Sequence, residues 1–221
     1  MEKHLVIAID GPAGSGKSTM SQALSKRLNI PYFSTGSMYR ALALKCARLH
    51  LDPASEETAD FIAKSTHLDL VFKNGNQIVL LDGEDVSNLL HTDEISLYAS
   101  QISTHKIIRE KMVEIQRKVA NQQSLVMDGR DIGSVVLPMA NFKFYLDADV
   151  NVRAKRRYDQ LVLSGNNISF DEVLEDMKNR DIRDKTRKIS PLVVAKDAII
   201  IDCTNLTIEE AVDEFMKYIG E

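Results

Sequence analysis

Short apolar runs alternate along this chain with longer segments in which apolar residues recur at helical spacing. The runs that we interpret as buried strands span residues 4–9, 30–33, 124–127, 142–146 and 198–201. Buried strands separated by helical segments are typical of a parallel sheet with helices on both faces. The pattern therefore predicts an α/β fold with a five-stranded parallel sheet flanked by helices.

One stretch, residues 67–87, breaks this alternation. It contains two short strand-like runs with Asn74-Gly75 between them, and a second turn signal follows at Asp82-Gly83. Asn-Gly and Asp-Gly pairs favour tight hairpin turns, so we expect a small antiparallel insert. No internal repeat or linker-like tract separates it from the rest, which predicts a single domain over residues 1–221.

Two helix starts are marked by capping boxes, Ser169 with Glu172 and Thr207 with Glu210. In the first of these helices, over residues 169–188, an apolar face begins at Phe170 and includes Met177. The same face then becomes charged at Arg180, Asp184 and Arg187. Charges on a core-facing stripe are costly unless they line a polar cleft, so we favour an anion-binding cleft. The alternative is a solvated helix with pairs four residues apart, Asp181 with Lys185 and Asp184 with Lys188.

Composition narrows the class of protein. The 221 residues are 44% hydrophobic and 27% charged, which suits a folded domain, and the net charge of −4 excludes a broadly basic nucleic-acid-binding surface. Cys46 and Cys203 match no metal-ligand spacing and predict buried, reduced thiols. The apolar run at residues 5–9 is too short for a signal peptide or a membrane span. We expect a cytoplasmic protein with no nucleic-acid or membrane partner.

Residues 11–18, Gly-Pro-Ala-Gly-Ser-Gly-Lys-Ser, fit the G-x-x-x-x-G-K-[ST] pattern between a strand and a helix. Backbone N–H groups of such a P-loop surround phosphate oxygens at a helix N-terminus. Lys17 is expected to reach the β- and γ-phosphates and Ser18 to supply a hydroxyl to Mg²⁺. The residues predicted to bind ATP are Gly11, Pro12, Ala13, Gly14, Ser15, Gly16, Lys17, Ser18 and Thr19.

The other motifs indicate which class of triphosphate-using protein this is. A GTPase is disfavoured because the guanine-reading Asn-Lys-x-Asp is absent from the sequence. Residues 34–40, Ser-Thr-Gly-Ser-Met-Tyr-Arg, follow the second strand, where parallel sheets bind ligands, and Arg40 there is placed to hold an acceptor phosphate. The alternative is an ordinary amphipathic helix with Arg40 in solvent.

Residues 126–138 place Asp128, Arg130 and Asp131 after another strand at the same edge of the sheet. Asp128 is expected to support Mg²⁺ through water, and Arg130 to contact a phosphate in a bidentate manner. The alternative is a charged tight turn.

A second basic cluster, Arg153, Arg156 and Arg157, opens the helix before residues 163–169, and we interpret the region as a lid. Arginines that arrive when a lid closes stabilise charge that develops during phosphoryl transfer.

No histidine falls within any of these motifs. A hydroxyl acceptor usually needs a positioned base, whereas a phosphate monoester is already an anionic nucleophile at pH 7. Many arginines without an evident base therefore favour a phosphorylated acceptor, although Asp128 or Asp131 remains a candidate base.

Together, the P-loop and the segments at 34–40, 127–138, 153–158, 180–187 and 190–204 resemble the bacterial cytidylate kinases over essentially the whole chain. The resemblance implies a P-loop fold that phosphorylates CMP and dCMP to CDP and dCDP with ATP and Mg²⁺. It also implies a monophosphate-binding insert at about residues 36–104 and a short helical lid at about 153–168.

The resemblance assigns roles to individual residues. Ser100, Arg109 and Asp131 would contact cytosine, Arg180 and Asp184 the ribose and nearby phosphate, and Arg40, Arg130 and Arg187 the phosphates, with Thr35 and Tyr39 completing the CMP site. Catalytic roles would fall to Lys17, Arg130, Arg153, Arg157, Arg180 and Arg187. Residues 101–110 otherwise resemble an ordinary amphipathic helix, so Ser100 and Arg109 carry no motif of their own. Ser34 departs from the family pattern, because many members carry Asp at this position, before the Thr-Gly pair.

Two rival functions stay open at this point. One is a kinase of another small metabolite, and the other is a nucleotide-binding switch without turnover. We expect a monomer in either case.

Overall fold

The computed structural model describes residues 4–73 and 75–220. Its central sheet is parallel, with strand order β2-β6-β1-β7-β8. The strands are β1 (Val6–Asp10), β2 (Tyr32–Ser34), β6 (Leu125–Gly129), β7 (Phe142–Asp147) and β8 (Ile199–Asp202). The predicted α/β fold is confirmed. Strands β1 and β6 end later than predicted because Asp10 pairs with Gly129, which extends the sheet to the edges of both motifs.

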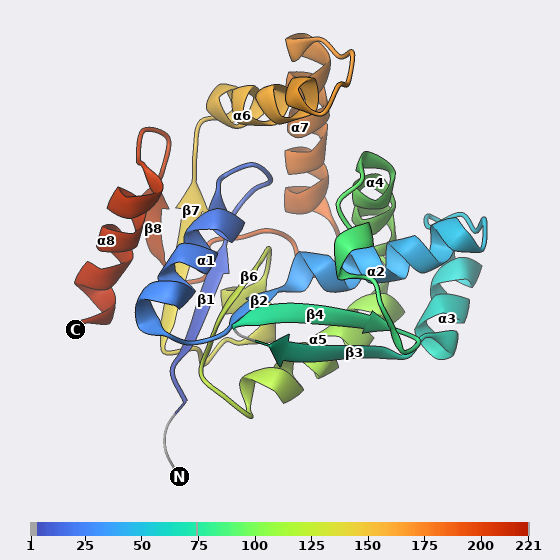
Figure 1. Ribbon diagram of the computed structural model, residues 1–221, viewed down its shortest axis with the longest axis horizontal. Helices are drawn as coiled ribbons and strands as arrows, with labels where there is room; N and C mark the ends of the chain where they lie inside the picture. The colour runs from blue at the N-terminus through green and yellow to red at the C-terminus, as the bar shows by residue number, and fades with distance from the viewer. Residues whose placement is uncertain (1–3, 74, 221) are drawn as a thin grey trace.

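Helices cover both faces of this sheet (Figure 1). On one face, Phe33, Ala8 and Met127 pack with residues of α2 and α5, and on the other, Ile7, Ile9 and Phe144 pack with residues of α1 and α8. Adjacent strand residues point to opposite faces, so both faces of each central strand are apolar. The helices are α1 (Lys17–Leu28), α2 (Thr35–Arg48), α3 (Glu56–Ser65), α4 (Asp93–Ile102), α5 (Lys106–Ala120), α6 (Val150–Leu163), α7 (Phe170–Thr186) and α8 (Ile208–Ile219).

A small antiparallel sheet lies beside α2, as the hairpin signals predict. Its strands are β3 (Leu68–Lys73), β4 (Asn76–Leu81) and the short β5 (Glu84–Asp85), so it has one strand more than the sequence indicates. The first predicted turn includes Asn74, which lies outside the described residues. The second turn forms at Asp82 and Gly83, which both have positive φ.

Both predicted capping boxes are present, at Ser169 and Thr207. Helix α7, however, ends at Thr186, so Arg187 follows the helix instead of extending its stripe. The interpretation of residues 101–110 as one helix is wrong, because α4 ends at Ile102 and α5 begins at Lys106.

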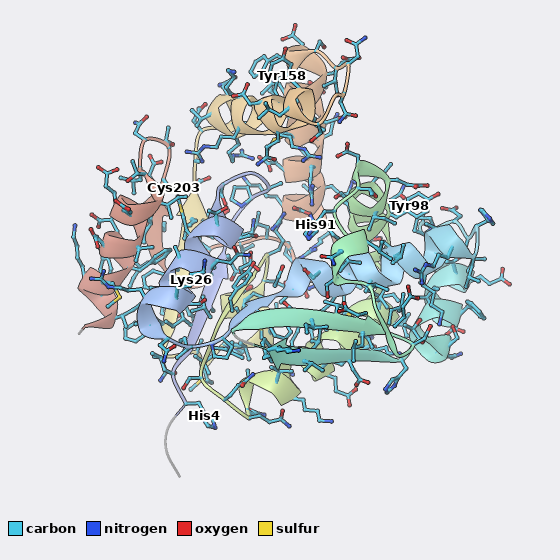
Figure 2. All side chains as sticks on the ribbon, viewed as in Figure 1. His4, Lys26, His91, Tyr98, Tyr158 and Cys203 are labelled. Atoms are coloured by element: carbon cyan, nitrogen blue, oxygen red, sulfur yellow. The ribbon has the colours of Figure 1, made fainter. Side chains whose placement is uncertain are left out.

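Helices α6 and α7 pack on each other above the P-loop (Figure 1). They share a small apolar cluster that includes Leu161, Val173 and Met177, and it reaches Ala13 of the loop. Tyr158, labelled in Figure 2, meets Phe170 edge to face with ring centroids 6.1 Å apart.

Two further expectations concern the whole chain. Cys46 and Cys203 are buried free thiols, as predicted. Over the range that the structure describes, every helix is too short or too polar to cross a lipid bilayer.

Candidate active site

The P-loop follows β1 and leads into α1. Gly14 and Gly16 have φ of 73° and 86°, which L residues rarely adopt, and a Cβ on Gly11 would lie 2.2 Å from the Leu146 carbonyl oxygen. Helix α1 begins without a side-chain cap at its N-terminus, and the Ser15 Oγ is buried without a hydrogen-bond partner among the described residues. These donors suit an anion of the size and charge of a phosphate group.

Lys17 lies inside this loop, where its Nζ donates to the Pro12 carbonyl oxygen at 2.8 Å. Burial, together with the nearby charge of Arg130, holds the pKa of Lys17 well below its usual value. A negative charge close to Lys17 would stabilise the charged form of its amine.

Asp128 stands beside the loop at the end of β6. Its carboxylate accepts hydrogen bonds from the Ser18 hydroxyl at 2.6 Å and from the Tyr32 hydroxyl at 3.0 Å, while Thr35 Oγ1 donates to its carbonyl oxygen at 2.8 Å. The Ser18 hydroxyl and the Asp128 carboxylate are oxygen donors of the kind that Mg²⁺ prefers. These two residues therefore fit the predicted metal site, with Tyr32 holding the carboxylate in place.

A cluster of cations surrounds Arg130. Burial, followed by repulsion from Arg130, lowers the pKa of Arg40 and lowers that of Arg180 to about 10, as it does for Lys17. The Arg180 Nε is buried without a hydrogen-bond partner among the described residues. Like charges gathered in a buried place are costly, and a bound phosphate would offset that cost.

Asp184 forms an ion pair with Arg130 at this cluster. It is 8% exposed and accepts from the Arg130 Nε at 2.9 Å. Although burial acts in the opposite direction, Arg130 and Arg180 lower the pKa of Asp184. The carboxylate of Asp181 likewise pairs with Arg153. Asp181 and Asp184 thus pair with Arg153 and Arg130 instead of forming the alternative surface pairs with Lys185 and Lys188.

A second polar group lies at the ends of α5 and β6. The Arg109 guanidinium, 3% exposed, pairs with Asp131, and the Arg187 Nη2 lies 3.6 Å from the other Asp131 oxygen. Tyr39 contributes its ring, whose centroid is 5.7 Å from the Arg109 guanidinium carbon. Donors and an acceptor are therefore held side by side in a buried position.

Ser100 reaches the site from α4. Its hydroxyl accepts from the Arg183 Nη1 at 3.0 Å. Arg183 also lines the cleft, and sequence reasoning did not select it as a site residue, although it follows Arg180 by three residues on the same helix. No pattern in the sequence distinguishes it from the other arginines of that helix.

The three lid arginines take different positions. Arg153 is buried against the P-loop, where its guanidinium donates to the Ala13 carbonyl oxygen at 3.0 Å and pairs with Asp181 at 2.6 Å. It does not line the cleft, and its predicted catalytic role stays a prediction. Arg156 donates to the carbonyl oxygens of Cys203 and Thr204, and Arg157 pairs with Asp93 of α4.

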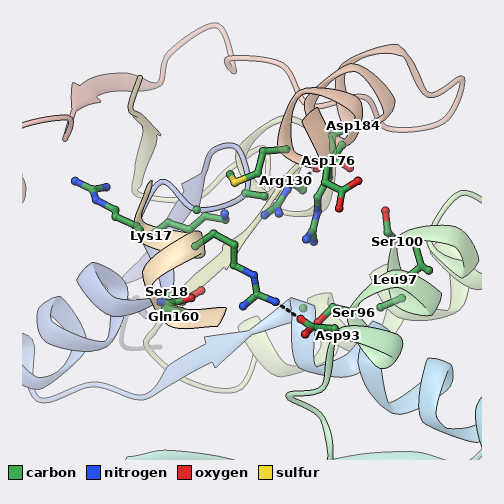
Figure 3. A pocket seen from close by; sticks show the side chains of 18 of the residues that line it. Lys17, Ser18, Asp93, Ser96, Leu97, Ser100, Arg130, Gln160, Asp176 and Asp184 are labelled. Carbon is green, nitrogen blue, oxygen red and sulfur yellow. Dashed lines mark hydrogen bonds and ion pairs between the residues drawn. The ribbon is translucent and has the colours of Figure 1, made fainter. Parts of the chain in front are cut away.

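One cleft of about 1700 Å³ joins these groups. Figure 3 shows Lys17 and Ser18 on one side, Arg130 and Asp184 beyond them, and Ser100 across the opening on α4. Other predicted residues in the lining are Ala13, Gly14, Gly16, Thr19, Thr35, Tyr39, Arg40, Arg109, Asp128, Asp131, Arg157, Arg180 and Arg187. Gly11, Pro12 and Ser15, which were predicted to bind ATP, are not among the lining residues. The structure thus brings together nearly all the predicted residues, with Arg153 apart.

The comparisons with known proteins point to one family. A sequence model described as cytidylate kinase matches residues 7–221. A cytidylate kinase of Caldicellulosiruptor saccharolyticus is 45% identical over 99% of this chain and 98% of its own, and one of Bacillus subtilis is 40% identical over 100% and 99%.

Among solved structures, a shikimate kinase of Bacteroides thetaiotaomicron has a TM-score of 0.51 at 13% identity, with 97% of this chain and 98% of its own covered. A protein of Eubacterium ventriosum has a TM-score of 0.52 at 20% identity over 98% of both chains. At these identities the likeness shows the P-loop kinase fold alone. The family model and the full-length relatives show more: the chain belongs to the cytidylate kinase family of nucleoside monophosphate kinases.

Proposed function

We propose that this protein transfers the γ-phosphoryl group of ATP to CMP and dCMP in the presence of Mg²⁺, forming ADP with CDP or dCDP. The observation that carries the proposal is the cluster of cations Lys17, Arg40, Arg130 and Arg180, which are buried or half-buried and line the same cleft as the P-loop and the pair formed by Arg109 and Asp131. A site for a phosphoryl group therefore stands between a triphosphate loop and a base-sized polar pocket.

In this reaction, an oxygen of the acceptor phosphate forms a bond to the γ-phosphorus, while the bond from that phosphorus to the β–γ bridging oxygen breaks. The acceptor is already an anion near pH 7, so the chain needs no general base. Lys17, Arg130 and Arg180 balance the negative charge of the transferring group, and Arg40 and Arg187 hold the acceptor phosphate. Mg²⁺, held by Ser18 and through water by Asp128, supplies further positive charge at the phosphates.

The base pocket favours cytosine through its pattern of donors and acceptors. The Asp131 carboxylate accepts from the 4-amino group, and the Arg109 guanidinium donates to the ring nitrogen N3 beside it. Uracil presents the opposite pattern at these atoms, with an acceptor at O4 and a donor at N3. A mismatched base leaves buried polar groups without partners, which costs about 1–3 kcal/mol per group.

Adenine offers an amino group next to a ring nitrogen as well, so its rejection must come from size. Its paired edge lies farther from the ribose than that of cytosine. With the edge seated between Arg109 and Asp131, the phosphate of AMP would be displaced from Arg40 and Arg130. Poor transfer to AMP follows from misplacement of the nucleophile.

An acceptor panel tests the proposal. The purified chain, with ATP and Mg²⁺, is assayed for kcat/KM with CMP, dCMP, UMP, AMP, GMP and a hydroxylated non-nucleotide such as shikimate. We expect kcat/KM to be highest for CMP and dCMP. Equal values for CMP and AMP, a preference for the hydroxylated acceptor, or the absence of any nucleoside diphosphate product would overturn the assignment. All residues assigned here come from one chain, so the proposed reaction requires no second copy.

A further inference from the structure

Asp10 is a buried carboxylate that none of the steps above uses. It is the last residue of β1, it is 3% exposed, and it immediately precedes Gly11 of the P-loop. Its two oxygens accept hydrogen bonds from the backbone N–H groups of Ile132 at 2.7 Å and Gly133 at 2.8 Å. One side chain thus joins the start of the ATP loop to a segment more than a hundred residues away.

The segment that Asp10 holds carries two residues of the acceptor site. Arg130 and Asp131 directly precede Ile132, and they point to Asp184 and to Arg109. After them the chain enters a short π-helical turn, Ile132–Val136, in which the N–H groups of Val135 and Val136 donate to the Asp131 carbonyl oxygen at 2.9 Å and 3.0 Å. Such turns leave backbone groups that need partners from outside. Asp10 supplies an acceptor for the first two N–H groups of this turn.

The backbone on the Asp10 side is also fixed. Gly11 lies so close to the Leu146 carbonyl oxygen that even a Cβ would not fit, and Asp10 itself is paired within the sheet to β6 and β7. A displacement of the Asp10 carboxylate therefore requires movement of the sheet edge. The position of residues 130–133 is consequently defined relative to the P-loop.

We propose that Asp10 is a positioning residue of the acceptor site, which sets Arg130 and Asp131 at a fixed place relative to the P-loop. This inference rests on the proposed function for the nature of the acceptor. It assigns no contact between Asp10 and either substrate, because Asp10 acts through the backbone of Ile132 and Gly133.

Stability alone does not account for a carboxylate at this place. Burial raises the pKa of Asp10 to about 7, even though the two N–H groups act in the opposite direction. A raised pKa in a carboxylate means that its charged form costs folding free energy. Asp10 lowers stability in its charged form, yet it accepts two short hydrogen bonds from the segment that carries Arg130 and Asp131. This combination fits a role in positioning that segment.

Asp10→Asn tests the role, because asparagine keeps the shape but can accept only one of the two hydrogen bonds. KM for CMP at saturating ATP is expected to rise about tenfold, as for the loss of one hydrogen bond to a charged group. KM for ATP at saturating CMP should change less than about twofold, since the P-loop backbone stays in place. Ser21→Ala is the matched control, because Ser21 is equally buried on α1 and its hydroxyl lacks a partner among the described residues. It should leave both constants unchanged.

Equal changes in the two KM values, or no change in either, would overturn the positioning role. If the variant does not fold, hydrogen exchange in the wild-type protein decides: the amides of Ile132 and Gly133 should exchange as slowly as those of β1, and exchange at the rate of an exposed loop would refute the proposal. A wild-type chain that prefers a different acceptor would contradict the proposed function alone. The same comparison, made with that acceptor, would still test Asp10.

Discussion

Asp93 and Arg157 form an ion pair across the mouth of the cleft, from the first turn of α4 to α6. Asp93 lies at the end of the dashed line in Figure 3. The Arg157 guanidinium is also close enough to Arg40 and Arg180 to contribute to the lowering of their pKa values. Arg157 is thus paired with Asp93 at the rim and is also close to Arg40 and Arg180, which we assign to the phosphates.

Asp93→Asn should therefore make the enzyme more active with CMP. Without the carboxylate, Arg157 no longer has to leave an ion pair in order to reach a phosphoryl group, and half-exposed pairs of this kind contribute up to about 1 kcal/mol. We expect kcat/KM for CMP to rise about two- to fivefold, which steady-state kinetics at low ionic strength can measure.

A double-mutant cycle isolates this effect. In an Arg157→Gln background, Asp93→Asn should have no effect, because the residue that it restrains is gone. A decrease in kcat/KM on Asp93→Asn, or an equal effect in both backgrounds, would show that the ion pair does not compete with the substrate.

Lys17→Met should lower activity strongly without loss of stability. Lys17 points into the P-loop, where we expect it to balance phosphate charge, and loss of one such group costs about 10²- to 10³-fold in kcat. Burial and Arg130 disfavour its charge in the folded protein, so the melting temperature should not fall. Lys26→Met, an exposed change on the same helix, is the control for activity. Turnover near the wild-type rate in Lys17→Met would contradict the P-loop assignment.

The sheet and the P-loop could be predicted from the sequence because their signals are local. An apolar run, three glycines and Lys17 lie within a few residues of one another, and their spacing already specifies the turn. The capping boxes at Ser169 and Thr207 are equally local, and both proved correct.

The contacts that shape the cleft could not be predicted in this way, because they join distant parts of the chain. Asp181 and Asp184 each have a lysine four residues later, yet their partners are Arg153 and Arg130, 28 and 54 residues away. Asp10 and Ile132 are separated by 122 residues. Local spacing carries no information on such pairs, which depend on the strand order of the sheet.

Arg180→Met and Asp184→Asn test the charged face of α7. The Arg180 Nε is buried and has no hydrogen-bond partner among the described residues, so loss of this side chain should lower kcat/KM by about 10²-fold with both CMP and dCMP. We expect Asp184 to contact the ribose. Loss of its carboxylate should therefore lower kcat/KM for CMP more than kcat/KM for dCMP, which lacks the 2′-hydroxyl. Steady-state kinetics with both acceptors measures the difference.

Lys185 and Lys188 supply the controls for this helix. Both are exposed, and neither lines the cleft. Their replacement by Met should change kcat/KM little. If these lysines and the two cleft residues behave alike, α7 does not face the substrate.

The pH dependence of stability should reveal the ionisation of Asp10. Its pKa in the folded protein, about 7, lies above the value of 3.8 for a free aspartate. Between these two values the folded state binds more protons at this group than the unfolded state does, so the contribution of Asp10 to stability falls as pH rises, and it becomes constant above the folded pKa.

Urea unfolding of the wild type and of Asp10→Asn at pH 5, 6, 7 and 8 measures this contribution. The free energy of unfolding of the wild type, minus that of the variant, should decrease between pH 5 and 7 by up to about 1.4 kcal/mol per pH unit. Asp197→Asn is the control: Lys143 lowers the pKa of Asp197, so its contribution is lost only at acidic pH below this window, and the corresponding difference should be constant from pH 5 to 8. A constant or rising difference for Asp10→Asn would mean that Asp10 is already ionised at pH 5, and that the two N–H groups of Ile132 and Gly133 outweigh the effect of burial.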